Sequence, residues 1–234
     1  MELAKPHLDV GCFTNRQKEL DAFYSEEMGL PFEGVLHIGP LAPLGAEVDQ
    51  YRYELRGSVL KVNQCGDPLA AATSAYRRLV VATEGVTEPV RMSDPDGLEV
   101  ELVPLGHGGV TGIGVVCAVS DTEAWGRFLT SALGAEPLGP GRYRVGETVL
   151  ALEAAPAQPR SGPIRARGLT YLTIQVRDVV GAHRRLGELG VEVATPPTRV
   201  GDVAAVCFVR DPGGSWIELA QRAALAGPLP DLDS

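Results

Sequence analysis

Apolar and polar residues along the chain repeat in the order strand, helix, strand, strand, strand. Residues 7–13 alternate with the two-residue period of a half-buried strand, and residues 14–28 then space their apolar side chains by three and four, as a helix does. Gly29 provides a stop for that helix. Three further strands, separated by Gly and Pro, are predicted at residues 32–39, 49–57 and 58–64. The first unit is therefore predicted to be a βαβββ module.

The same order returns twice later in the chain. The third unit begins with a strand at residues 112–121, whose last residue is a helix-capping Asp, and continues with a helix at 122–134 and two strands within 141–153. The fourth unit begins with a strand at 169–178, and a helix at 179–190 leads to three more strands. Three full copies of the module are thus visible.

A degraded copy lies between the first and the third unit. Residues 75–104 keep a first and a last strand but have no room for a helix. Each unit exposes an apolar sheet face that another unit must cover, so the repetition determines the fold. The glycine-rich stretch 106–109 divides the chain into two halves, residues 1–106 and 110–222. The sequence predicts an α+β fold of tandem βαβββ modules, with the second module truncated and lacking its helix.

Composition narrows the classes of function. The chain has 234 residues, 44% of them hydrophobic, which is enough for a sizeable core. Its net charge is −9 and it has no lysine-rich tract, which argues against binding to nucleic acid. No apolar run approaches the roughly 20 residues of a membrane span, and the N-terminus lacks a basic segment followed by a long apolar one. We therefore expect a cytoplasmic protein with no nucleic-acid and no membrane partner.

Several chemical motifs are missing from the sequence. It has no phosphate-binding loop, no Gly-x-Ser-x-Gly elbow and no His-Glu-x-x-His helix. The four cysteines, Cys12, Cys65, Cys117 and Cys207, have no Cys-x-x-Cys spacing. We expect them to be buried thiols and not a disulfide framework.

One motif occurs twice at corresponding places. The stretch from Ser93 to Gly106 and the stretch from Arg210 to Gln221 both contain Asp-Pro-x-Gly, three more residues and then Glu-Leu. The first four residues are typical of a tight turn. The repeat puts Glu101 and Glu218 at the same place in two strands. Each glutamate is either part of a functional site or held in a salt bridge, for Glu101 with Lys61 or Arg78.

The modules contain the stretches "HLDV" followed by "DAFYSEEMGLPF", "RFLTSALGAEPL", and the closing "DPDGLEVEL" and "DPGGSWIEL". In these stretches the sequence resembles the vicinal oxygen chelate superfamily, which includes glyoxalase I, bleomycin-resistance proteins and extradiol dioxygenases. It implies that paired modules wrap into two cups of the glyoxalase/bleomycin-resistance type. In the metal-using members, ligands come from the first and last strands of each module. The family includes isomerases, epimerases, dioxygenases, thiol transferases and proteins that sequester antibiotics, so the fold alone leaves the function open.

The resemblance also implies where the ligand positions fall in this chain. First-strand positions fall on His7, Arg78, Gly114 and Tyr171, and last-strand positions fall on Lys61, Glu101, Leu150 and Glu218. If neighbouring modules pair, the N-terminal cup receives His7, Lys61, Arg78 and Glu101. Two of these four are cations and would repel a divalent ion. The C-terminal cup receives Gly114, Leu150, Tyr171 and Glu218, of which the carboxylate is the one strong metal ligand.

The C-terminal cup is the site that we favour. Strand alternation adds Thr173, Gln175 and Trp216 to it, and the result is a mostly apolar, aromatic-lined hollow typical of a small-molecule site. We therefore predict a protein of the glyoxalase/bleomycin-resistance type that binds a small organic molecule without a catalytic metal. Tyr171 and Trp216 would stack on the ligand, and Glu218 would pair with a ligand cation or act as a base. The predicted catalytic residues are Glu218 and Tyr171, and the predicted ligand contacts are Trp216, Thr173, Gln175, Leu150, His7, Glu101, Lys61 and Arg78.

Three alternatives stay open at this point. The first is a lyase, isomerase or dioxygenase that uses Fe, Zn, Ni, Mn or Mg, held by His7 together with Glu101 or Glu218. Asp9 or His37 would supplement His7 and Glu101, or the first module would pair with the fourth and bring His7, Tyr171 and Glu218 together. In the second, the metal-free hollow catalyses acid-base chemistry. In the third, one half has lost its site and serves as a pairing surface, and the protein is a monomer or a homodimer.

Overall fold

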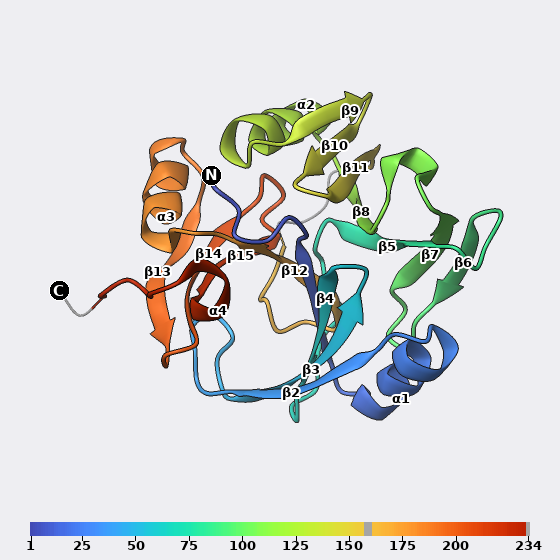
Figure 1. The fold of residues 1–234 in the computed structure, drawn as a ribbon, viewed down its shortest axis with the longest axis horizontal. Coiled ribbons are helices and arrows are strands. Elements are labelled where there is room, and N and C mark those ends of the chain that lie inside the picture. Colours follow the sequence, from blue (N-terminus) through green and yellow to red (C-terminus); the bar gives the residue numbers. More distant parts are fainter. Residues whose placement is uncertain (157–160, 233–234) are drawn as a thin grey trace.

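The chain folds into two mixed β-sheets with short helices at the periphery (Figure 1). The computed structural model describes residues 1–156 and 161–232. In spatial order, the eight-stranded sheet contains β13 (Val193–Val200), β14 (Ala204–Arg210), β15 (Trp216–Arg222), β12 (Gly168–Gln175), β1 (Asp9–Thr14), β4 (Ser58–Gln64), β3 (Val48–Leu55) and β2 (Phe32–Ile38). The seven-stranded sheet contains β6 (Val90–Ser93), β7 (Glu99–Pro104), β5 (Tyr76–Thr83), β8 (Ile113–Val119), β11 (Thr148–Ala154), β10 (Arg142–Val145) and β9 (Glu136–Gly139).

Three short helices, α1 (Gln17–Asp21), α2 (Thr122–Arg127) and α3 (Val179–Glu188), each follow the first strand of a module. A further short helix, α4 (Ala223–Ala226), follows β15. The first two continue into π-helical turns at Ala22–Glu27 and Phe128–Ala132, and a 3₁₀ turn covers His107–Gly109. Asp121 and Asp178 cap α2 and α3 by accepting backbone N–H groups at 2.8 and 2.9 Å. None of the helices in the described residues has the length and apolar character that a membrane crossing requires.

The predicted modules are confirmed. The first, third and fourth have the order strand, helix, strand, strand, strand, and the second, from β5 to β7, has no helix. Two short strands were not predicted. They are β6 in the second module and β9 in the third, each four residues long. A strand of that length shows too little alternation to be recognised in the sequence.

The predicted pairing of neighbouring modules is wrong. Strand β1 pairs antiparallel with β12, which joins the first module to the fourth. Strand β5 pairs antiparallel with β8, which joins the second module to the third. In Figure 1, β1 and β12 lie side by side in the middle of the molecule, although they come from opposite ends of the chain. Residues 1–106 and 110–222 therefore do not each form a cup, and the alternative pairing of first with fourth is the one present.

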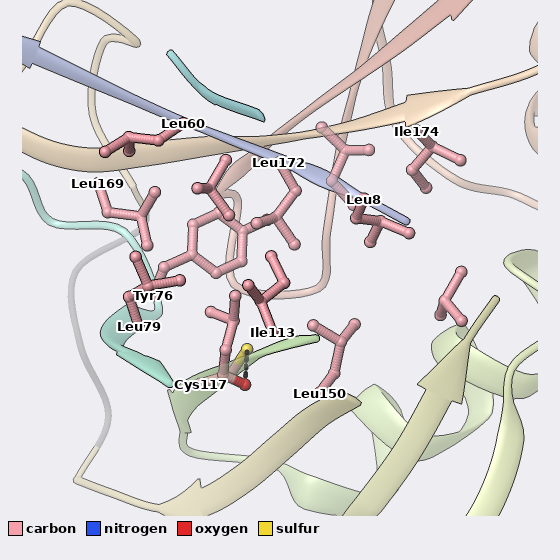
Figure 2. Close-up of a cluster of buried hydrophobic side chains, with 14 of the residues drawn as sticks. Leu8, Leu60, Tyr76, Leu79, Ile113, Cys117, Leu150, Leu169, Leu172 and Ile174 are labelled. Carbon is pink, nitrogen blue, oxygen red and sulfur yellow. Dashed lines mark hydrogen bonds between the residues drawn. The ribbon is translucent and has the colours of Figure 1, made fainter. Parts of the chain in front are cut away.

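The main hydrophobic core fills the space between the two sheets. Figure 2 shows Leu172 of β12 and Leu60 of β4 facing Leu79 of β5 and Leu150 of β11 across this space. All four cysteines are buried and free, as expected from their spacing. Because one face of each sheet packs into this shared core, the other face is left to form a hollow. We call these hollows the Lys61 cup, on the eight-stranded sheet, and the Arg78 cup, on the seven-stranded sheet.

Candidate ligand-binding site

The Lys61 cup has apolar walls above a polar floor. It encloses about 630 Å³ of atom-free space, counting its open mouth. The walls come from β2, the segment after it and the last module, and they consist of Leu36, Ile38, Leu41, Leu44, Val200, Val203, Val206 and Phe208. Polar side chains on the central strands and on β3 form the floor and include Gln50, Arg52, Lys61, Tyr171, Gln175, Glu218 and Arg222. An apolar hollow with a few convergent polar groups is the usual form of a small-molecule site.

An ion pair lies at the centre of this floor. The Lys61 ammonium donates to Glu218 Oε2 and to Thr173 Oγ1, both at 2.7 Å, and the Thr173 hydroxyl donates to the same Glu218 oxygen at 2.5 Å. The side chains of Lys61 and Glu218 are 7% and 12% exposed. The glutamate predicted to be chemically important therefore has an internal cation as its partner.

Tyr171 lies across β1 beside this ion pair. It faces Gly11 in the β1–β12 register, and a Cβ atom at Gly11 would come within 2.0 Å of the tyrosine ring. Only glycine leaves room for the ring at this point. Asn63 Nδ2 donates to the Tyr171 hydroxyl at 3.1 Å, and the Lys61 ammonium is 5.7 Å from the ring centroid. Burial, and then the charge of Glu218, raise the pKa of Tyr171 well above 10, so its hydroxyl keeps its hydrogen at neutral pH.

Asp9 supports the floor from below. Its carboxylate accepts from Lys5 Nζ at 2.6 Å, from the backbone N–H of Val59 at 2.9 Å and from Gln175 Nε2 at 3.1 Å. These three hydrogen bonds occupy the carboxylate oxygens of Asp9, and two of them link β1 to the residues of β4 and β12. Asp9 is therefore a structural acceptor here.

The residues of the Lys61 cup do not fit a divalent metal ion. The Lys61 ammonium occupies the position beside Glu218 Oε2 where such an ion would bind, and its charge would repel the ion. His7 is outside the hollow, with its ring against Gly57 and Gly112. In the described part of the chain, no three His, Cys, Asp or Glu side chains are grouped closely enough to hold a metal.

The Arg78 cup has an apolar floor and a charged rim. Val80, Val103, Val116 and Val149 form its apolar cluster. The buried guanidinium of Arg78 contacts Glu153 at 2.8 Å, Glu101 at 3.2 Å and Glu99 at 3.5 Å. Glu101 also pairs with the exposed Arg91 at 2.9 Å. The salt bridge expected between Glu101 and Arg78 is thus present, and Lys61 lies in the other cup.

Apart from Trp216, the predicted site residues lie in four places. Lys61, Tyr171, Thr173, Gln175 and Glu218 come together on the floor of the Lys61 cup. Arg78 and Glu101 are in the Arg78 cup. Leu150 faces the core between the sheets (Figure 2), and His7 lies near the turn between β3 and β4.

Trp216 is on the cup face of β15 but is covered. Its indole Nε1 donates to the carbonyl oxygen of Gly162 at 3.1 Å, and the Arg210 guanidinium lies 3.2 Å from the ring centroid. The side chain is absent from the lining of the hollow. The structure therefore gives Trp216 packing partners that leave no face open for a ligand to stack on.

Three residues of the floor were missed in the sequence. Gln50 and Arg52 are on β3, and Arg222 is the last residue of β15. Strand alternation would have placed Gln50 and Arg52 on one face, and Arg222 on the face of Glu218. The family resemblance places ligand positions only on the first and last strands of a module, which excludes β3. Arg222 lies on a last strand, but four residues beyond the position of Glu218.

The repeated turn explains why Asp-Pro-x-Gly occurs twice. Asp94 accepts backbone N–H groups from Asp96 and Leu98 and the hydroxyl of Tyr24. Asp211 in the same way accepts from the backbone of Gly213 and Ser215 and from the hydroxyl of Tyr76. In both copies the aspartate fixes a turn that sends the chain into β7 or β15. The motif is therefore structural, and the glutamate that follows it is a separate feature.

Comparison with known proteins agrees with this architecture. Residues 113–219, which cover the third and fourth modules, match the model of the Glyoxalase/Bleomycin resistance protein/Dioxygenase superfamily. A candidate dioxygenase from Bacillus subtilis shares 16% identity with a TM-score of 0.71, over 98% of this chain and 92% of that one. Glyoxalase I from Zea mays shares 14% identity with a TM-score of 0.64, over 92% of both chains. At these identities the two structures establish the fold of the whole chain and not its activity.

Proposed function

We propose that this member of the glyoxalase/bleomycin resistance protein/dioxygenase superfamily binds a small organic molecule in the Lys61 cup and needs no divalent metal to do so. The observation that carries the proposal is the Lys61 ammonium, held 2.7 Å from Glu218 Oε2 at the base of an apolar hollow. A fixed ammonium supplies a hydrogen-bond donor to a ligand without an exchangeable ion. Sequestration of a toxic compound, as in resistance proteins, requires nothing more than such a site.

The floor provides donors for an oxygen atom of the ligand. Two of the three ammonium hydrogens of Lys61 are used by Thr173 and Glu218, which leaves one for a ligand. The Tyr171 hydroxyl accepts from Asn63, and its own hydrogen has no acceptor in the described residues. A carbonyl or phenol oxygen between Lys61 and Tyr171 would therefore receive two hydrogen bonds in a low-dielectric site.

A second candidate function, metal-free proton transfer, is favoured by one feature of Glu218. Its Oε2 atom accepts two hydrogen bonds, whereas Oε1 accepts none from the described part of the chain. That free oxygen could remove a proton from a bound ligand, with Tyr171 and Lys61 stabilising the resulting oxyanion. Exchange of a ligand C–H hydrogen for deuterium, followed by NMR, would detect this activity. Wild-type exchange that is lost in Glu218→Gln supports it, and equal exchange in both excludes it.

The metal-dependent alternative has less support. It relied on His7 with Glu101 or Glu218, and these three residues lie at the turn between β3 and β4, in the Arg78 cup and in the Lys61 cup. The two glutamates are each paired with a cation of the chain itself. Each of these cations lies beside its carboxylate and would repel a divalent metal.

Metal analysis together with ligand binding tests the proposal. Protein purified without chelators is analysed for transition metals, and a library of small aromatic and aliphatic compounds is screened by thermal shift before and after EDTA treatment. We expect the same hits in both screens, and we expect Lys61→Met to lose them. The matched control, Arg91→Met, removes a cation from the Arg78 cup and should keep them. A stoichiometric metal that is lost in Glu218→Ala, or binding that needs added metal, would overturn the proposal.

A further inference from the structure

The floor of the Lys61 cup contains a buried acceptor that none of the described residues satisfies. The side chain of Gln175 lines the hollow, the residue is 2% exposed, and its Oε1 atom has no hydrogen-bond partner within residues 1–156 and 161–232. The orientation of the amide is fixed, because its Nε2 donates to Asp9 and an ionised carboxylate can only accept. Since a buried polar atom without a partner costs free energy, Oε1 is suited to accept an O–H or N–H from a ligand.

The lining of the Lys61 cup also carries an excess of positive charge. The side chains that line the hollow include three cations, Arg52, Lys61 and Arg222, and one carboxylate, Glu218. The Lys61–Glu218 pair cancels, and Arg52 contacts Glu33 at 3.5 Å and Gln50 at 3.0 Å. Arg222 has no ion-pair or hydrogen-bond partner for its guanidinium among the described residues. A half-buried arginine at the edge of an apolar hollow is a natural contact for a carboxylate.

Strand register relates these two groups in space. Gln175 on β12 lies beside Ala220 on β15, and Arg222 is two residues further along β15 on the same face. Two residues along a strand span about 7 Å. The two side chains therefore leave the sheet at separate points, and a ligand that meets both carries its donor and its anionic group at different ends.

We propose that the ligand is an amphipathic organic acid, with an apolar body, one carboxylate that pairs with Arg222 and one hydroxyl or N–H group that donates to Gln175 Oε1. The inference rests on the proposed function, because it assigns a ligand class to the same hollow. The apolar walls from Leu36 to Phe208 cover the body of the molecule. An organic cation is disfavoured, because Glu218 is already paired and the remaining charge of the lining is positive.

Three matched probes test this class. 4-Hydroxyphenylacetate carries both groups, phenylacetate lacks the donor, and 4-hydroxyphenylacetamide lacks the charge. Isothermal titration of wild-type protein should show 4-hydroxyphenylacetate as the tightest of the three, with each analogue weaker by about tenfold. Removal of one buried hydrogen bond or one charge-assisted contact has an effect of this size.

Two variants assign each preference to its residue. In Gln175→Met, 4-hydroxyphenylacetate and phenylacetate should bind alike, because the acceptor is gone. In Arg222→Gln, 4-hydroxyphenylacetate and its amide should bind alike, because the charge is gone. Arg184→Gln is the matched control, since Arg184 is exposed on α3 and its loss changes the net charge equally. It should keep both preferences.

The outcomes separate this inference from the proposed function. If a neutral compound such as 4-methylphenol binds as tightly as the acid and its binding is lost in Lys61→Met, the hollow is a binding site but the acid class is wrong. If the preferences persist in Gln175→Met and Arg222→Gln, the assignment to these residues is wrong. If no compound of any charge binds in a manner that depends on Lys61, both proposals are wrong.

Discussion

The two cups carry a glutamate at the same place in their last strand and use it differently. Glu218 in the Lys61 cup is buried beside one ammonium, under walls supplied by long outer strands. Glu101 in the Arg78 cup shares two arginines, one of them exposed. The outer strands β2, β3 and β13 have seven or eight residues, whereas β6, β9 and β10 have four. The outer strands of the eight-stranded sheet are thus longer than those of the seven-stranded sheet, and β2 and β13 contribute side chains to the walls of the Lys61 cup.

The charge balance of the two floors differs as well. In the Lys61 cup the Lys61–Glu218 pair lies beside neutral groups of Tyr171 and Gln175, and Arg52 and Arg222 also line the hollow. In the Arg78 cup most of the polar groups are charged, and Arg78 pairs with Glu99, Glu101 and Glu153. A ligand entering the first hollow meets groups with free hydrogen-bonding capacity, and in the second it competes with solvated salt bridges.

The largest effect is expected from Lys61→Met. It leaves Glu218 buried without its cation, and breaking a buried pair in this way costs about 3–5 kcal/mol. Chemical denaturation would measure the loss as a lower free energy of unfolding. The double variant Lys61→Met, Glu218→Met should recover most of it, because apolar groups of similar size then replace both charges. A loss below about 1 kcal/mol for the single variant would mean that the pair is exposed to water in solution.

A pH effect is expected at the turn before β15. Burial raises the pKa of Asp211 to about 7 from its ordinary value of 3.8. Because the folded-state pKa is the higher one, the carboxyl stabilises the fold at acidic pH, and this contribution is lost as pH rises through about 7. Relative to Asp211→Asn, wild-type protein should lose up to about 4 kcal/mol of stability between about pH 4 and pH 8. A difference that does not change with pH would contradict this.

The corresponding turn before β7 offers an internal comparison. Burial also raises the pKa of Asp94, which accepts from Tyr24 as Asp211 does from Tyr76. Asp94→Asn should therefore change the pH dependence in the same direction. Thermal melts of both variants across the same pH series would show whether the two turns are equivalent.

The sequence predicted the modules well because their signals are local. Alternation, helix spacing and the Asp and Gly residues at helix ends lie within each module, and the missing helix follows from the short distance between two strands. The pairing of modules has no local signal. Strand β12 is buried along its whole length, and β1 likewise, so neither shows which partner it prefers. Pairing is decided by contacts between residues more than a hundred positions apart.

Uniform burial also explains why Leu150 of β11 was predicted to line a cup. The first three residues of β11 are all buried, so alternation does not reveal which of them faces the core. The predicted register was wrong by one residue. It assigned Leu150 to the cup, whereas Leu150 faces the core and its neighbour Val149 lines the Arg78 cup. Glu101 and Glu218 were placed correctly because the turn before them fixes the register of their strands.

A smaller loss of stability is expected from Gly11→Ala, at the point where the Tyr171 ring lies across β1. Gly11→Ala places a methyl group within 2.0 Å of the Tyr171 ring, and overpacking of this kind costs about 1–3 kcal/mol. Ligand binding should weaken together with stability, because the ring moves off the floor. Gly114→Ala is the control in the Arg78 cup, where the nearest atom would be at 3.1 Å. If Gly11→Ala is no more destabilising than Gly114→Ala, Tyr171 is not held over β1 in solution.

The smallest effect is expected from Arg91→Gln, which takes a cation from Glu101 as Lys61→Met takes one from Glu218. Arg91 is 59% exposed, and Glu101 keeps its contact with Arg78 at 3.2 Å. An exposed ion pair contributes about 0–1 kcal/mol, and salt screens it further. Denaturation at low and high ionic strength should therefore show little loss, and none at high salt. A salt-independent loss comparable to that of Lys61→Met would mean that the Arg78 cup is as closed as the Lys61 cup, which would remove the energetic distinction between the two hollows.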